Sequence, residues 1–175
     1  MHDPKAARSR ADGPSDAATY ERARRHANLA MWTIALQRRR LKTTEPEDAE
    51  FLFRRWSDFQ FLIVALRRLR RAATLAAKVP VLANEMRKAL ARFDAAIPAS
   101  KKLRDIAEHF DDYALDRGRD PTVSRRTLEV GAVGDSVFEW LGEEINADAA
   151  TSGAQILFKD IQDAQYLIAS EETDE

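Results

Sequence analysis

The feature that most constrains the fold is a long run of apolar residues spaced three or four apart in the first half of the chain. The run comprises Leu52, Trp56, Phe59, Leu62, Ile63, Leu66, Leu69, Ala73 and Ala76. Because an α-helix has about 3.6 residues per turn, residues at this spacing lie on one side of a helix. A stripe sustained over several turns is typical of a helix that faces the core of a bundle.

Four further stretches show helical spacing of apolar residues, and polar or proline-containing breaks separate them. They cover about 17–42, 82–97, 100–117 and 149–169. Proline cannot donate a backbone hydrogen bond inside a helix. Pro46 is therefore expected near the start of the central helix, Pro80 at its end or at an interruption, and Pro98 at the end of the next helix.

Between Thr127 and Leu141 the spacing changes to alternation on both sides of Gly134-Asp135, which predicts a short β-hairpin. Two strands alone are marginally stable, so Phe138 and Trp140, or the opposite Val and Leu face, must pack onto the helices. The predicted fold is mainly α. It is a helical bundle of about five helices with a hairpin insertion at about 127–141 before the last helix.

The predicted organisation is a single helical domain at 18–170, with a disordered arm at 1–17 and an acidic tail at 171–175. A chain of 175 residues is long enough for one good core and short for two. The absence of cysteine excludes disulfides and thiolate metal sites and favours the reducing cytoplasm. No apolar run resembles a signal peptide or a membrane span, so no membrane contact is expected.

Charge is distributed unevenly along the chain. Residues 1–102 contain 22 Lys and Arg against 11 Asp and Glu, whereas residues 103–175 contain 6 against 18. Such asymmetry indicates either a basic surface for nucleic acid or mutual attraction of the two parts inside one fold. The second interpretation needs no partner, because a binding patch must be clustered in space as well as in sequence.

Familiar catalytic motifs are absent, and the sequence around His109 carries the functional prediction. No glycine-rich phosphate loop, Gly-x-Ser-x-Gly elbow, His-Glu-x-x-His or calcium loop occurs, so no cofactor and no metal are expected. His2 falls in the predicted arm, which leaves His26 and His109 as candidates. The segment Arg104-Asp105-Ile-Ala-Glu108-His109-Phe110-Asp-Asp resembles the signature of the HEPN superfamily, in which an Arg, a polar residue and a His share one helix.

The HEPN resemblance implies a helical bundle that often forms a homodimer and, in active members, cleaves RNA without a metal. Asp105 stands where Asn is commoner in the family. On this hypothesis His109 transfers a proton to or from the ribose and leaving oxygens, because an imidazole ordinarily titrates near neutral pH. Arg104 would stabilise the phosphorane charge, and Asp105 would orient the His109 ring.

A cluster of arginines on the central helix, Arg67, Arg68, Arg70 and Arg71, is the predicted RNA-binding surface. On one straight helix Arg104 and His109 fall on different flanks. The site is therefore expected to be composite and to lie at the interface of a homodimer. A toxin or defence role, with an antitoxin-like protein partner, is implied by the resemblance alone.

Three alternatives remain open from the sequence. Arg104 with Glu108, and Asp105 with His109, are also ordinary surface pairs one turn apart. The chain would then be a non-catalytic helical interaction or scaffold protein, or an RNA-binding module. A carboxylate metal site at Glu108, Asp111 and Asp112 is the least favoured, because adjacent acids on a helix point apart.

Overall fold

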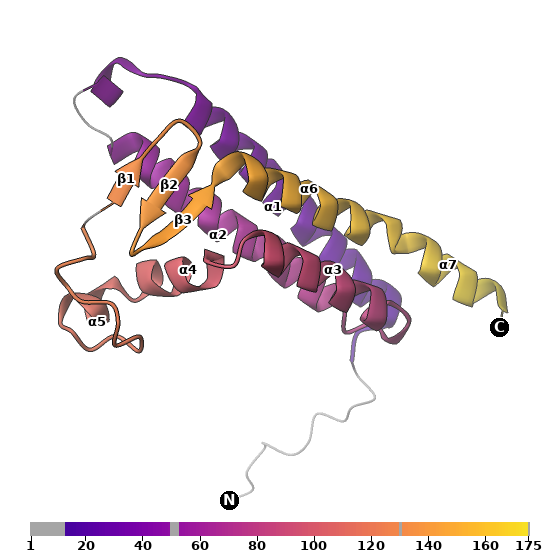
Figure 1. Cartoon of the computed structure of the whole chain (residues 1–175). Helices are drawn as coiled ribbons and strands as arrows, with labels where there is room; N and C mark the ends of the chain where they lie inside the picture. The colour runs from indigo at the N-terminus through magenta and orange to yellow at the C-terminus, as the bar shows by residue number, and fades with distance from the viewer. Residues whose placement is uncertain (1–12, 50–52, 130, 175) are drawn as a thin grey trace, which may run out of the picture.

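The predicted central helix, α2 (Phe53–Ala76), is the element against which most others pack (Figure 1). In the computed structural model, residues 13–49, 53–129 and 131–174 are described. Within them α2 contacts α1 (Asp16–Lys42), α3 (Ala83–Ala96), α4 (Ser100–Glu108) and α6 (Ala147–Asp163). The side chains with no exposed surface include Phe59, Leu62, Leu66 and Leu69 of α2. The prediction of a mainly α bundle with a small β insertion is confirmed; Leu52 of the predicted stripe lies outside the described residues.

Helices α1 and α6 pack through small side chains. Ala23, Ala27 and Ala30 of α1 are buried, as are Ala150 and Ala154 of α6. Alanine leaves room for helix backbones to approach, so α1 lies close to both α2 and α6. Side-chain oxygens cap both helices: Ser15 accepts a bond from the Ala18 N–H, and Asn146 accepts from the backbone N–H groups of residues 148 and 149.

The bundle also contains short helices that the apolar spacing did not predict. A 3-10 turn, η2 (Pro46–Ala49), precedes α2, and a second, η3 (Pro80–Leu82), precedes α3. The predicted helix at 149–169 is two helices, α6 and α7 (Gln165–Asp174), which meet at Ala164. Residues 1–12 of the predicted arm and Glu175 of the predicted tail lie outside the described residues, and the backbone at 171–174 belongs to α7.

The β insertion is a three-stranded antiparallel sheet in the order β1–β2–β3. Strands β1 (Gly131–Val133) and β2 (Val137–Trp140) form the predicted hairpin around Gly134-Asp135. Strand β3 (Glu143–Asn146) pairs with β2 and was not anticipated. It follows a two-residue turn in which Leu141 and Gly142 both have positive φ, 57° and 74°, as a type I′ hairpin requires.

An aromatic cluster attaches the sheet to α2, as the hairpin pattern requires. Phe138 stacks on Phe59 with ring centroids 4.3 Å apart, and Trp56 meets the edge of Trp140 at 5.7 Å. Arg55 donates hydrogen bonds to the carbonyls of Gly134 and Asp135, each at 2.8 Å. The sheet therefore sits at the end of the bundle where α2 begins (Figure 1). Phe138 and Trp140 form the face that packs on the helices.

Several ion pairs join the basic part of the chain to the acidic part. Arg38 lies 2.8 Å and Lys42 3.5 Å from the Asp148 carboxylate, and Arg92 lies 2.9 Å from Asp160. These ion pairs balance part of the uneven charge of the sequence inside the fold, where α1 and α3 meet α6. No helix in the described ranges is both long and apolar enough to cross a membrane.

The Asp148 pairs predict a loss of stability in acid. Burial of the Asp148 carboxyl raises its pKa, but the Ser136 hydrogen bond and the charges of Arg38 and Lys42 outweigh burial, so the pKa is lowered. A carboxyl whose pKa is lower in the folded state contributes stability above its unfolded pKa of about 4, and that contribution is lost as pH falls through the folded pKa.

We expect Asp148→Asn to lower the urea midpoint at pH 7, and the deficit to shrink as pH falls and the wild-type carboxyl becomes protonated. Asp135→Asn is the matched control, because the Asp135 carboxylate forms no ion pair with the described residues. A deficit of the Asp148 variant that does not change as pH falls would contradict the ion-pair explanation.

Candidate functional site

Helix α4 ends at His109, within the segment that carries the HEPN resemblance. The backbone at His109 has φ −118° and ψ 34°, and the short helix α5 (Phe110–Ala114) begins at the next residue. The sequence predicted one continuous helix here. The break redirects the chain after Glu108, so side chains on the two sides of His109 no longer follow a single helical wheel.

Acidic residues lie on both sides of this break. Glu108 is the last residue of α4, and Asp111 and Asp112 lie in the first turn of α5. Acidic side chains are favourable in the first turn of a helix and unfavourable in its last. The break therefore suits Asp111 and Asp112, whereas Glu108 is compensated by its ion pair with Arg104.

Arg104, Asp105 and His109 all line one groove within a single chain. The groove has a volume of about 840 Å³ and lies between α4, α5 and the loop that follows α5. The residues that line it are Pro98, Lys101, Lys102, Arg104, Asp105, Ile106, His109, Asp112, Tyr113, Gly118, Arg119, Asp120 and Pro121. One chain therefore places Arg104 and His109 along the same groove. The composite site at a homodimer interface stays a prediction.

Two carboxylates hold the Arg104 guanidinium. Its nitrogens lie 2.5 Å from Asp105 and 2.5 Å from Glu108, and only 15% of the side chain is exposed. The Arg104 Nε atom is buried and has no hydrogen-bond partner among the described residues.

The His109 imidazole is exposed and forms no side-chain hydrogen bond with the part of the chain that is described. Only its backbone is engaged: its N–H donates to the Asp105 carbonyl at 3.1 Å and its carbonyl accepts from the Tyr113 N–H at 3.2 Å. Asp105, predicted to orient the ring, instead pairs with Arg104. The imidazole is consequently free to exchange protons with a molecule in the groove.

The four arginines predicted to bind RNA do not form one surface. Arg70 donates two hydrogen bonds of 2.6 Å to Asp94 of α3. Arg67 lies on the α4 side, where burial and the charges of Arg70 and Arg104 lower its pKa. Arg68 and Arg71 instead line a groove between α1 and α2. Only Arg67 is thus close to the motif residues.

Arg67 adds positive charge beside Arg104. Its Nε atom is also buried and without an acceptor in the described structure. The carboxylates of Asp94 and Asp105 offset part of the charge of Arg67, and Asp105 and Glu108 pair with Arg104. A phosphate or carboxylate ligand would have to compete with these carboxylates.

Three basic residues of the groove were missed by sequence reasoning. Lys102 forms an ion pair with Glu143 at 2.8 Å, whereas Lys101 and Arg119 pair with no carboxylate of the described residues. The adjacent lysines at 101–102 and the Arg-Gly-Arg sequence at 117–119 were the available signals. Lys101 and Lys102 lie on α4, whereas the position of Arg119 depends on the loop after α5, which periodicity does not describe.

The loop is held against α5 by Tyr113 and Gly118. The Tyr113 hydroxyl accepts a hydrogen bond of 3.1 Å from the Asp120 N–H. A Cβ added at Gly118 would lie 2.1 Å from the Tyr113 ring, well inside van der Waals contact. Glycine at 118 is therefore required for the close approach that forms this wall of the groove.

We expect Gly118→Ala to displace the loop and to destabilise the protein by about 1–3 kcal/mol, the usual cost of overpacking. Thermal unfolding measures the stability, and quenching of a label at position 119 measures the loop. Gly134→Ala is the control, since its nearest neighbour would lie at 3.3 Å. A Gly118 variant with unchanged stability and loop position would show that the loop is not fixed by this contact.

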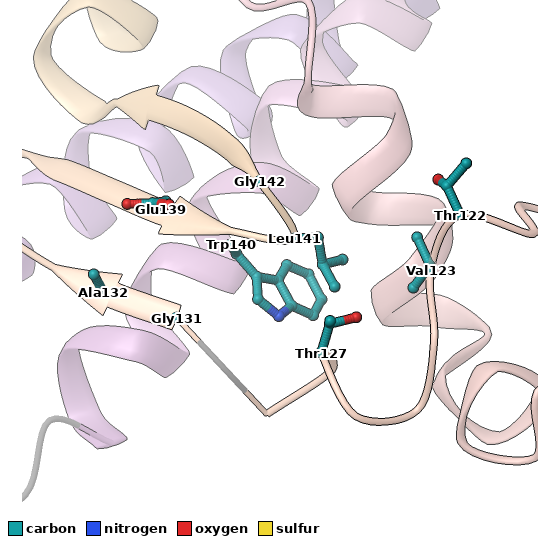
Figure 2. Close-up of a pocket in the computed structure, with 9 residues that line it drawn as sticks. All are labelled: Thr122, Val123, Thr127, Gly131, Ala132, Glu139, Trp140, Leu141 and Gly142. Atoms are coloured by element: carbon teal, nitrogen blue, oxygen red, sulfur yellow. The ribbon is translucent and has the colours of Figure 1, made fainter.

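A second hollow of about 460 Å³ lies between the sheet and the loop at 122–127 (Figure 2). The Trp140 indole projects into it from β2, with Thr127 and Val123 nearby. The indole N–H is already bonded to the Leu128 carbonyl at 2.9 Å. Among the described residues that line this hollow, Glu139 alone carries an acidic or basic side chain. None of the predicted site residues lines it, so it is not a candidate for the nuclease site.

Neither a metal site nor a similarity to known proteins indicates what this protein does. Among the described residues no group of three or more His, Asp or Glu side chains could hold a metal ion, and this includes Glu108, Asp111 and Asp112. Comparison with protein-family models, curated proteins and solved structures finds no match for this chain. The function is therefore inferred from the groove itself.

Proposed function

We propose that the groove at 98–121 binds an RNA phosphodiester and that the protein is a HEPN-like, metal-independent endoribonuclease. The observation that carries this proposal is that Arg104 and His109 line one groove of a single chain. Lys101 and Arg119 also line this groove and form no ion pair with a carboxylate of the described residues. Their positive charge attracts the RNA backbone.

The reaction is transfer of the phosphoryl group to the neighbouring ribose oxygen. His109 takes the proton from the 2′-hydroxyl, and the 2′ oxygen forms a bond to phosphorus. The bond from phosphorus to the 5′ oxygen breaks, and that oxygen leaves with a proton. The products are a 2′,3′-cyclic phosphate and a 5′-hydroxyl, so neither an oxidant nor a metal is consumed.

Arg104 stabilises the charge that develops on the phosphoryl oxygens. Only 15% of its side chain is exposed, and electrostatic interactions in a partly buried region are stronger than in water. Asp105 positions the Arg104 fork through the ion pair between them. Glu108, whose side chain is 45% exposed, is the partner that a phosphate would displace.

A homodimer would complete the site. A second copy brings a second His109, which would protonate the leaving 5′ oxygen while the first acts as base. The HEPN resemblance supports this arrangement, and a toxin or defence role controlled by an antitoxin-like protein is the corresponding biological proposal.

The test is incubation of the purified protein with RNA of mixed sequence in EDTA. We expect cleavage products that carry 2′,3′-cyclic phosphates, and no cleavage of the same sequence made with 2′-deoxyribose. Intact RNA, or activity that disappears with the chelator, would overturn the proposal. The first result would favour a non-catalytic interaction protein, in which the Arg104 pairs are purely structural.

A further inference from the structure

The outer surface of α1 carries a row of exposed apolar side chains that the proposed nuclease site does not use. Leu29, Trp32 and Leu36 are 59%, 75% and 43% exposed. Residues three, four and seven apart share one face of a helix, so these side chains form a continuous strip. Trp32 is therefore a surface residue of α1 and does not belong to the core.

A groove lies beside this strip, between α1 and α2, and has a volume of about 480 Å³. Leu29 belongs to both features, which makes the strip and the groove one surface. On the α2 side the groove is lined by Arg68, Arg71 and Leu75. An apolar helix face next to a groove of this kind is the usual receptor for a second amphipathic helix.

The groove carries positive charge that is not paired. Arg68 and Arg71 line it and form no ion pair with a carboxylate in the described ranges. By contrast, Arg24 and Arg25 both pair with Glu21, and Arg70 pairs with Asp94. Arg68 and Arg71 are therefore available to a negatively charged partner.

We propose that the α1–α2 outer face binds an amphipathic helix of a partner protein, with apolar residues every three or four positions and acidic residues on both flanks. Burial of Leu29, Trp32 and Leu36 would drive the association, and the arginines would select an acidic partner. A second copy of this chain is disfavoured, because a twofold contact would place the same arginines opposite one another. RNA is disfavoured because two aliphatic side chains occupy the strip.

The test uses a synthetic helical peptide with leucines at helical spacing and glutamates on both flanks. Binding should shift the emission of Trp32 to shorter wavelength in a saturable manner, since a highly exposed indole becomes buried. The shift should be absent in Trp32→Phe, which retains Trp56 and Trp140. The double variant Arg68→Glu/Arg71→Glu should bind at least about tenfold more weakly, equivalent to about 1.4 kcal/mol.

The matched control peptide has lysine in place of each glutamate and should not bind. The proposal is overturned if the acidic peptide causes no shift, if both peptides bind equally, or if an RNA oligonucleotide produces the Trp32 shift. It is also overturned if wild type self-associates in sedimentation and Trp32→Arg abolishes that association. Circular dichroism of each variant establishes that the fold is intact. Cleavage of RNA is a separate readout, so loss of peptide binding does not bear on the nuclease proposal.

Discussion

His109→Ala is expected to lower the rate of RNA cleavage by about 10²- to 10⁴-fold, the usual contribution of a general acid or base. The melting temperature should stay close to that of wild type. The ring is exposed and makes no side-chain hydrogen bond with the described residues, so its removal costs the fold little. Single-turnover kinetics on a short RNA, together with thermal unfolding, measure both effects.

His26→Ala is the matched control, because His26 is also an exposed histidine but lines the groove between α1 and α2. It should cleave at the wild-type rate. If His109→Ala cleaves RNA as fast as wild type, His109 takes no part in the reaction. A large fall in melting temperature for His109→Ala would instead assign it a structural role.

Arg54→Met is expected to destabilise the protein by about 3 kcal/mol, because it breaks the most connected ion-pair network of the described structure. Arg54 bonds to the carboxylates of Asp48 and Asp58. It also donates to the carbonyls of Arg40 at 2.8 Å and Thr43 at 2.7 Å, at the C-terminus of α1. Asp58 is only 3% exposed, so its charge would lose one of two cationic partners.

Equilibrium unfolding in urea measures this loss. Arg39→Met is the control: Arg39 is exposed and pairs with no carboxylate of the described residues, so its replacement should change stability by less than about 0.5 kcal/mol. Similar midpoints for the two variants would mean that the network at the α1–α2 connection contributes no net stability.

Most of the fold is readable from the sequence, because apolar spacing and proline positions report directly on burial. The stripe from Trp56 to Ala76 became α2, and alternation around Gly134-Asp135 became β1 and β2. The apolar pattern did not predict strand β3, because Ile145 is its one buried residue and the other three are polar. A strand with one buried side chain is too short to show alternation.

The candidate site residues could be named from the sequence, but their contacts could not. The motif gives Arg104, Asp105 and His109, yet the pairing of Arg104 with Asp105 and Glu108 and the break at His109 are not visible in the apolar spacing. The arginines of α2 show the same limit of a sequence pattern. Residues 67–71 span more than one helical turn, so Arg68 and Arg71 face α1 while Arg67 and Arg70 face α4 and α3.

The most direct test of the central claim is a proton NMR titration of the histidine rings with a short RNA whose reactive 2′-hydroxyl is replaced by hydrogen. The chain has three histidines, so the His109→Ala and His26→Ala variants assign the signals. A phosphodiester in the groove between α4, α5 and the following loop should shift the His109 signals saturably and leave those of His26 unchanged. Movement of the His26 signals alone, or no movement at saturating RNA, would contradict the placement of the RNA site at Arg104 and His109.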